Sequence, residues 1–169
     1  MNIRKIRSNE RNWVNEFIQS HWGSEQIIVH NKIYVPADHE GFVSENEEEK
    51  IGLVTYNVQK NSCEIVTLNS TIEHHGFGKA LVQAVIDEAK SKGCGIVWVV
   101  TTNENIRAIE FYQKLGFQLI MVYPDAVNYS RKIKPEIPNV ANNGIPIRDE
   151  LEFVLQLSPA SNDSVQNIK

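Results

Sequence analysis

The apolar residues of this chain recur at two spacings, which separate the expected helices from the expected strands. Residues 9–20 have the periodicity of an amphipathic helix, whose apolar stripe consists of Trp13, Val14, Phe17 and Ile18. Shorter strand-like runs, separated by polar turns, occupy residues 2–7, 41–45, 50–59 and 62–71. Residues 24–41 fit neither pattern and stay unassigned.

In the second half of the chain, helical and strand patterns alternate. An amphipathic helix begins near residue 77 and ends at Gly93, and its stripe consists of Phe77, Ala80, Leu81, Ala84, Val85 and Ala89. The continuous apolar run 96–100 predicts a strand that is buried on both faces. Asn105 is expected to cap a third helix, which ends at Gly116. The remaining strands are residues 118–123 and 151–157.

This order of elements predicts a mixed α/β sheet with at least one parallel βαβ unit. We expect one domain over residues 1–157 and a polar, disordered tail over residues 158–169. A connection of unusual length, residues 125–148, precedes the last strand and has room for a short helix over residues 125–133. The connection either covers a binding site, packs on a second subunit, or forms a mobile surface loop.

Composition and charge narrow the class of protein. The net charge of −4 argues against generic nucleic-acid binding and is compatible with a cationic small substrate. No apolar run approaches the roughly 20 residues that span a bilayer, and the first residues lack an apolar signal segment. We therefore expect a cytoplasmic protein that does not contact membranes. Cys63 and Cys94 form no CxxC pair, which favours buried reduced thiols over a zinc site or a disulfide.

A glycine-containing turn connects one predicted strand to the second helix, in the order His75-Gly76-Phe77-Gly78-Lys79-Ala80. A helix N-terminus leaves backbone N–H groups unpaired, and glycines let a ligand approach them closely. This combination suits a pyrophosphate, although a turn without a ligand has the same pattern. The turn is not a GxxxxGK[ST] phosphate loop, and Leu81 stands where the GxGxxG pattern needs its third glycine.

A second motif makes the first one specific. One strand after the glycine turn, the chain reads Asn105-Ile-Arg-Ala108-Ile-Glu-Phe111-Tyr112-Gln-Lys-Leu-Gly116-Phe117. This segment resembles the N-x-x-A-x-x-F-Y-x-K-L-G-F signature of the GCN5-related N-acetyltransferase (GNAT) superfamily, and the resemblance extends from the first strand to Leu157. The glycine turn is similar to that family's (Q/R)-x-x-G-x-(G/A) loop, with Glu73 at the position that is usually Gln or Arg.

The chain also resembles a narrower, uncharacterised bacterial-type subgroup of that superfamily. The shared segments are His21-Trp22-Gly23-Ser24, Cys63-Glu-Ile-Val-Thr-Leu-Asn-Ser70 and Gly144-Ile-Pro-Ile-Arg-Asp-Glu-Leu-Glu152. The superfamily resemblance implies an acyl-CoA N-acyltransferase fold, with a splayed central sheet flanked by helices. It also implies acetyl-CoA as the cosubstrate, and direct attack by a small-molecule or peptide amine within a ternary complex. We expect a monomer or a homodimer.

The resemblance also implies roles for individual residues. The residues expected to bind acetyl-CoA are Leu68, Asn69, Ser70, His75, Gly76, Phe77, Gly78, Lys79, Ala80, Asn105, Ala108 and Tyr112. Tyr112 corresponds to the tyrosine that protonates the departing thiolate. The residues expected near the acceptor are His21, Trp22 and Tyr34.

The general base has two candidates. Glu64 occupies the strand position of a catalytic carboxylate, but it could equally be a solvent-facing or salt-bridged residue, and His21 is the alternative base. The neighbouring His74 and His75 do not indicate a metal site, since adjacent residues seldom converge on one ion. Two other functions stay open: a non-catalytic acyl-CoA-binding or sensor domain, and an interaction module that dimerises through the long connection.

Overall fold

The computed structural model describes residues 1–47, 49–72 and 75–157. Its strands are β1 (Asn2–Lys5), β2 (Ile27–Val29), β3 (Lys32–Tyr34), β4 (Glu40–Asn46), β5 (Glu49–Gln59), β6 (Ser62–Ser70), β7 (Ile96–Thr102), β8 (Gln118–Tyr123) and β9 (Glu150–Gln156). Its helices are α1 (Arg11–Trp22), α2 (Phe77–Ser91), α3 (Ile106–Lys114) and α4 (Ala126–Ile133), with 3-10 turns at η1 (Ser8–Glu10) and η2 (Pro36–Asp38). The predicted tail, Glu73 and His74 lie outside the described residues.

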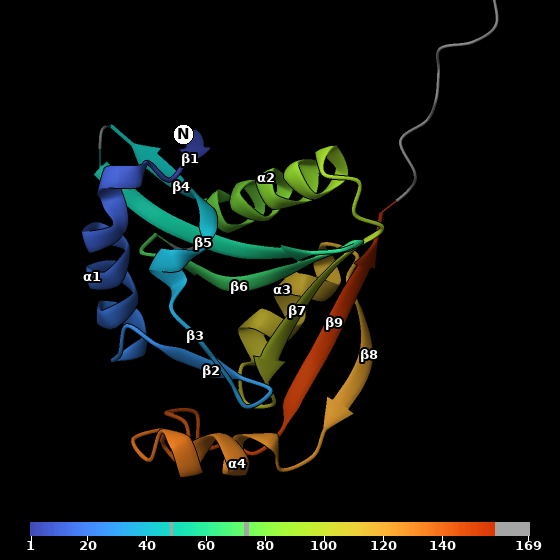
Figure 1. The fold of residues 1–169 in the computed structure, drawn as a ribbon. Coiled ribbons are helices and arrows are strands. Elements are labelled where there is room, and N and C mark those ends of the chain that lie inside the picture. The colour runs from blue at the N-terminus through green and yellow to red at the C-terminus, as the bar shows by residue number, and fades with distance from the viewer. Residues whose placement is uncertain (48, 73–74, 158–169) are drawn as a thin grey trace, which may run out of the picture.

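The described residues form a seven-stranded mixed sheet in the order β1-β4-β5-β6-β7-β9-β8, which confirms the predicted fold class (Figure 1). Strands β6 and β7 run parallel, and each of the other neighbouring pairs in this sheet is antiparallel. Strands β2 and β3 make a separate small hairpin. The sheet has helices on both faces, with α1 at one side of the molecule and α2 above the long strands.

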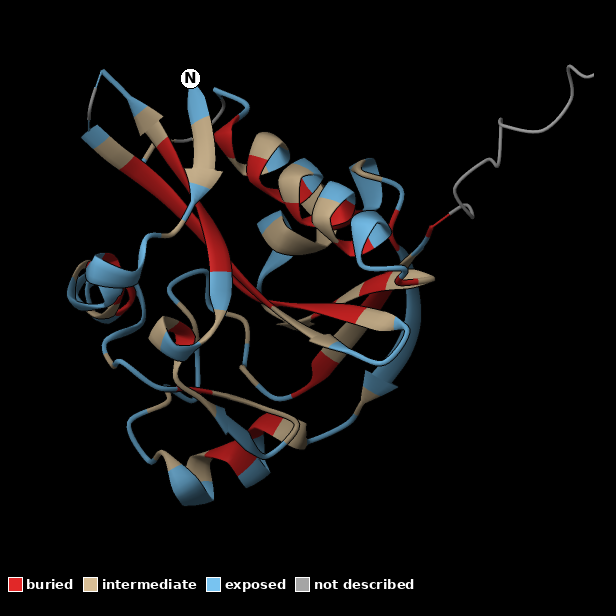
Figure 2. Cartoon of the chain, turned by 45° about the horizontal axis from the view of Figure 1, so that its top comes forward, coloured by how far each residue is buried: buried red, intermediate tan, exposed pale blue. Residues whose placement is uncertain are grey.

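Alternation along β4 and β5 determines which helix covers which face. Phe42 and Val54 belong to the main core, to which α2 and α3 contribute. Their neighbours Val43 and Leu53 point to the opposite face and pack with α1. The buried residues follow the central strands and the inner side of α2 (Figure 2). The apolar stripes predicted for α1 and α2 therefore face the core. Cys63 and Cys94 are buried free thiols, as predicted.

The central strands separate soon after they meet. Strands β6 and β7 pair only from Ser62 with Ile96 to Ile65 with Val99. Opposite β5, the register of β6 shifts by one residue at Val66, as in a β-bulge. From Val66 onward β6 keeps its pairing with β5 but has no register with β7. This is the splayed sheet expected from the sequence.

Two expectations change. Strand β7 was predicted to be buried on both faces, which is wrong: Val97 and Val99 are buried, while Trp98 and Val100 between them are half-buried. Its second face is covered only in part, because the main core lies on the side of α2 and α3. The unassigned segment 24–41 contains the β2–β3 hairpin, whose turn residues His30 and Asn31 have positive φ angles of 48° and 59°.

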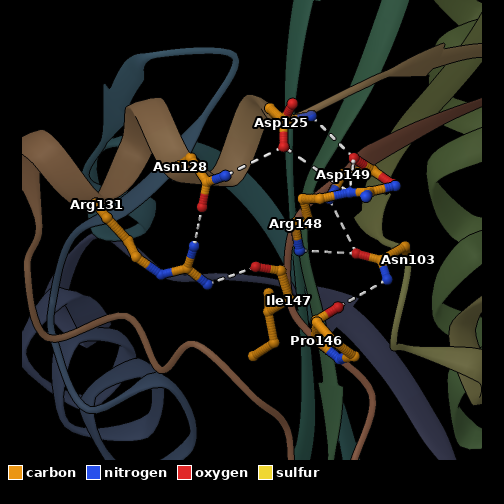
Figure 3. Close-up of polar contacts among 8 residues, drawn as sticks. All are labelled: Asn103, Asp125, Asn128, Arg131, Pro146, Ile147, Arg148 and Asp149. Carbon is orange, nitrogen blue, oxygen red and sulfur yellow. Dashed lines mark hydrogen bonds and ion pairs between the residues drawn. The ribbon is translucent and has the colours of Figure 1, made fainter.

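Hydrogen bonds attach the long connection 125–148 to the end of β7 (Figure 3). It begins with the predicted short helix, α4. At the end of β7, Asn103 Oδ1 accepts from the backbone N–H groups of Arg148 and Asp149 at 2.9 Å each, and its Nδ2 donates to the Pro146 carbonyl at 2.9 Å. The Arg131 guanidinium donates to the carbonyl of Ile147. This network favours an ordered connection over a mobile loop.

None of the helices in the described ranges combines the length and the apolar character that a membrane crossing requires.

Replacing Asn103 by Ala should loosen the connection. Asn103→Ala removes three hydrogen bonds, so we expect a loss of about 1–3 kcal/mol in the free energy of unfolding, measured with urea. Hydrogen exchange should accelerate at the Arg148 and Asp149 amides. Gln113→Ala, on the exposed side of α3, is the matched control and should leave both quantities unchanged. Unchanged exchange in Asn103→Ala would contradict a holding role for this side chain.

Candidate active site

Two cavities among the described residues flank the region where β6 and β7 part. The larger, which we call the β6–α3 cavity, has a volume of about 630 Å³. Its walls are the end of β6, the start of α2 and one side of α3. The lining residues are Leu68, Asn69, Ser70, Ile72, Gly76, Phe77, Gly78, Lys79, Asn105, Arg107, Ala108, Glu110, Phe111, Tyr112 and Lys114.

The N-terminus of α2 faces this cavity with its amide groups available. Gly76 precedes the helix with φ of +81°, and no described side chain caps it. The first helical hydrogen bond runs from the Ala80 N–H to the Gly76 carbonyl at 3.0 Å. The N–H groups of Phe77, Gly78 and Lys79 are therefore not used by the helix itself. Together with the helix dipole they favour an anionic ligand.

Gly78 keeps the backbone open at this point. A Cβ atom built on Gly78 would meet only the Phe111 ring, at an ordinary contact distance of 3.5 Å. The protein's own packing thus does not require a glycine here, whereas a ligand against the backbone would. Lys79 and Arg107 add positive charge to the lining, whereas Lys114 is paired with Glu110 of the same wall. The residues present therefore fit the pyrophosphate of a coenzyme A molecule.

Helix α3 supplies the other wall. Asn105 caps it, as predicted, because its Oδ1 accepts from the Ala108 N–H at 3.2 Å. One side of α3 carries Tyr112 into the core, where its ring meets Phe111 and Phe117 edge-on at centroid distances of 5.2 and 5.4 Å. Burial raises the pKa of the Tyr112 hydroxyl. Tyr112 therefore holds its proton at neutral pH while lining the cavity.

Glu64 lies within the sheet on β6 and is only 5% exposed, so the solvent-facing alternative is wrong. The Tyr34 hydroxyl of β3 donates a hydrogen bond to Glu64 Oε2 at 3.0 Å. Burial raises the pKa of Glu64, and the Tyr34 hydrogen bond acts in the opposite direction. The result is a carboxylate that accepts a proton more readily than one in water.

A histidine that the sequence did not single out, His30, contacts two carboxylates of β9 and interacts electrostatically with Glu64. His30 Nδ1 is 2.7 Å from Glu150 Oε2, and its Nε2 is 3.8 Å from Glu152 Oε2. The Glu150 hydrogen bond raises the pKa of His30 against the opposing effect of burial. Tyr123 donates to Glu152 Oε2 at 2.6 Å. The sequence signal for this group of His30, Tyr123 and two glutamates is weak: Glu150 and Glu152 are two positions apart on one strand and therefore share a face.

The second cavity, which we call the hairpin cavity, has a volume of about 230 Å³ and lies among the β2–β3 hairpin, α4 and the end of β7. Its lining residues are Trp22, Ile27, Ile28, Thr102, Glu104, Val127, Ser130, Lys134, Glu136, Ile137, Pro138, Ile147 and Glu150. Trp22 Nε1 donates to Asn69 Oδ1 at 2.8 Å. Since Asn69 lines the β6–α3 cavity, this hydrogen bond joins the walls of the two cavities.

Most residues predicted to bind the cofactor line one cavity, with two exceptions. His75 is exposed and, like Ala80, does not belong to the described lining of the β6–α3 cavity. Among the acceptor candidates, Trp22 lines the hairpin cavity and Tyr34 contacts Glu64. His21 instead lies near the end of α1, where its Nδ1 is 2.8 Å from the Phe17 carbonyl, and it lines neither cavity.

No group of three or more metal-binding side chains occurs within residues 1–47, 49–72 and 75–157.

Solved structures of other acetyltransferases have the same fold. The chain is similar to a Bacillus subtilis acetyltransferase in complex with CoA, with a TM-score of 0.66 and 20% identity, over 93% of this chain and 99% of that one. It is also similar to the ribosomal-protein-S18-alanine N-acetyltransferase of Escherichia coli, with a TM-score of 0.62 and 14% identity, over 98% of this chain and 99% of that one. At these identities the likeness concerns the fold alone.

Sequence comparison gives nearer relatives. The uncharacterized protein YdhI of Bacillus subtilis (strain 168) is 43% identical over 151 residues, which cover 88% of this chain and 94% of that protein. The uncharacterized protein YxbD of the same organism is 40% identical over 158 residues, covering 93% and 99%. The model of the acetyltransferase (GNAT) family matches residues 8–117. The chain therefore belongs to the GNAT family of acetyltransferases.

Proposed function

We propose that this protein transfers the acetyl group of acetyl-CoA to a primary amine, by direct attack within a ternary complex. The observation that carries the proposal is the pair of cavities beside the parting of β6 and β7. One of them has in its wall the N-terminus of α2, which no described side chain caps. On the paired part of β6, Glu64 is a buried carboxylate with a raised pKa. Membership of the GNAT family supports the same reaction class.

The β6–α3 cavity would hold the cofactor. Acetyl-CoA, when bound, supplies an acetyl group that is activated as a thioester. The backbone N–H groups of Phe77, Gly78 and Lys79 donate to the pyrophosphate. The edge of β6 from Leu68 to Ser70 has no register with β7, so its backbone groups are available to bind the pantetheine amides as an added strand would. The backbone N–H of Leu68 is the candidate donor that polarises the thioester carbonyl.

The two proton transfers of the reaction are assigned to two side chains, Glu64 on β6 and Tyr112 on α3. Glu64 accepts a proton from the attacking amine, directly or through a water molecule, which leaves the nitrogen lone pair free to attack. Tyr112 gives its proton to the departing thiolate, and its position in the lining of the β6–α3 cavity supports this role. Neither Glu64 nor His21 belongs to the lining of the two cavities. The burial of Glu64 and its raised pKa support it over His21, whose Nδ1 contacts the Phe17 carbonyl of its own helix.

The proposal is tested by adding acetyl-CoA and primary amines to the purified protein. We expect free CoA thiol to appear together with an equal amount of acetylated amine, measured by thiol titration and mass spectrometry. Acetyl-CoA binding without CoA release for any amine would instead favour the sensor alternative. Incubation of the protein with acetyl-CoA but no amine gives the background rate of acetyl-CoA hydrolysis.

The pH dependence should identify Glu64 as the base. The carboxylate form is the active one, so kcat/KM falls as the pH drops through the raised pKa of Glu64. Glu64→Gln should lower kcat by about 10²–10⁴-fold and abolish this acidic limb. Tyr34→Phe removes a hydrogen bond that lowers the pKa, so the limb should move to higher pH. Tyr129→Phe, exposed on α4, is the control; an acidic limb that persists in Glu64→Gln rules Glu64 out.

Tyr112→Phe tests the proton donor. The ring and its core contacts are kept, so the melting temperature should change little, while kcat falls by about 10²–10⁴-fold and the KM for acetyl-CoA stays the same. The loss should be smaller with an acyl thioester whose leaving thiol has a low pKa, because such a thiolate leaves without a proton. Equal losses for both thioesters would show that the Tyr112 hydroxyl does not donate the proton.

A further inference from the structure

The β2–β3 hairpin is too small to keep its own position on the protein. Its strands pair over three positions only, beginning with Ile27 and Tyr34. An isolated two-stranded hairpin is at best marginally stable in water, so its place depends on contacts with other elements. The hairpin contributes Ile27 and Ile28 to the hairpin cavity, the proposed side of the acceptor. Because Tyr34 donates to Glu64, whatever holds the hairpin also holds this contact with the proposed base.

Three carboxylates lie on the face of the sheet that the hairpin contacts. Glu64 on β6, and Glu150 and Glu152 on β9, are each next to residues that pack in the main core, so their side chains point to the opposite face. Glu150 is only 3% exposed. Within the described ranges, the hydrogen-bond and ion-pair partners of its carboxylate all belong to His30. A buried carboxylate with one partner residue depends strongly on that residue.

His30 lies in the turn of the hairpin and meets β9 with its backbone and its ring together. The His30 N–H donates to both oxygens of Glu150, at 3.3 and 3.2 Å, and the ring Nδ1 is 2.7 Å from Glu150 Oε2. The same ring meets the Tyr123 ring edge-on, at a centroid distance of 4.2 Å. Two donors of one residue thus attach the tip of the hairpin to a strand 120 positions away in the chain, at the end of β9 nearest α4 (Figure 1).

The charge of His30 strengthens this attachment. The hydrogen bond with Glu150 raises the pKa of His30 against the effect of burial, and the charges of Glu150, Glu152 and Glu64 act in the same upward direction. Tyr123 keeps its proton, because its hydrogen bond with Glu152 raises its pKa to about 12. A histidine whose pKa is raised by folding stabilises fully below its ordinary pKa and loses this effect as the pH rises through the raised value. The attachment therefore weakens in alkali.

We propose that His30 is a positioning residue for the proposed base: its bond to Glu150 holds the β2–β3 hairpin on the sheet and thereby keeps the Tyr34 hydroxyl on Glu64. This inference rests on the proposed role of Glu64 and adds a residue that acts on it through Tyr34. Lys32 of the same hairpin provides the contrast, since it acts on Glu64 through its charge and does not attach the hairpin to the sheet.

A double-variant cycle on the pKa of Glu64 tests this role. His30→Asn removes the ring and keeps the left-handed turn, with φ of 48°, which Asn adopts readily. In the unmodified protein, Tyr34→Phe should raise the pKa of the Glu64 carboxyl by about one pH unit, measured by carbon NMR without acetyl-CoA or amine. In the His30→Asn background, Tyr34→Phe should shift that pKa little, because the hydroxyl is no longer held on the carboxylate. The acidic limb of kcat/KM should follow the same pattern.

Lys32→Gln is the matched control, since it removes a positive charge of the hairpin and keeps the attachment. Tyr34→Phe should therefore retain its full effect on the pKa of Glu64 in that background. Glu150→Gln leaves the turn unchanged and removes the charge that His30 binds, so it should suppress the effect of Tyr34→Phe as His30→Asn does. Agreement of these two variants separates loss of the bond from a local defect in the turn.

Hydrogen exchange gives a readout that needs no variant. The protection of the hairpin amides, relative to that of the β5 amides, should fall as the pH rises through the raised pKa of His30. Protection that does not change with pH, or a full effect of Tyr34→Phe in both His30→Asn and Glu150→Gln, would overturn the positioning role. If an acidic limb persists in Glu64→Gln, the proposed base is wrong, and the NMR cycle still decides whether His30 holds Tyr34 on Glu64.

Discussion

The separation of β6 and β7 after four paired positions is the constraint on which the rest of the structure depends. Backbone groups of a strand need hydrogen-bond partners, and a sheet that opens in its middle leaves two inner edges without them. Each strand is therefore held from its outer side. β6 stays paired with β5 as far as Ser70, and β7 stays paired with β9 as far as Thr102. These outer pairings and the bulge at Val66 keep the two strands apart without a bound ligand.

The chemistry of the site follows from this opening. The helix after β6 starts where the two strands are apart, so the N–H groups of its first turn, which the helix itself does not use, face a cavity instead of a neighbouring strand. Tyr112 reaches the same cavity from α3 through a mostly aromatic core. On β6, Glu64 lies in the part that is still paired, where burial raises its pKa. The proposed proton acceptor thus belongs to a paired strand, and the proposed proton donor to a helix that packs on the main core.

The proposed acceptor side is assembled differently, from segments that are distant in the chain. The β2–β3 hairpin, the end of β7 and the connection 125–148 meet around the hairpin cavity. Hydrogen bonds from Asn103 and Asn143 attach that connection to the end of β7, and Lys134 attaches it to the hairpin. Change in any of these segments would reshape the acceptor wall and leave the cofactor wall as it is.

The sequence alone determined the four helices, the strands of the large sheet, the cap at Asn105 and the group of residues around the β6–α3 cavity. These features depend on periodicity and on two local motifs, which are legible within some twenty residues of chain. Only the tertiary structure revealed the hairpin within residues 24–41, the half-covered second face of β7 and the surroundings of Glu64. It also brought His30 to Glu150, 120 positions away, and gave Glu104 a place in a cavity wall. No local pattern encodes such contacts, because they arise when separately formed elements pack and bury each other's charges.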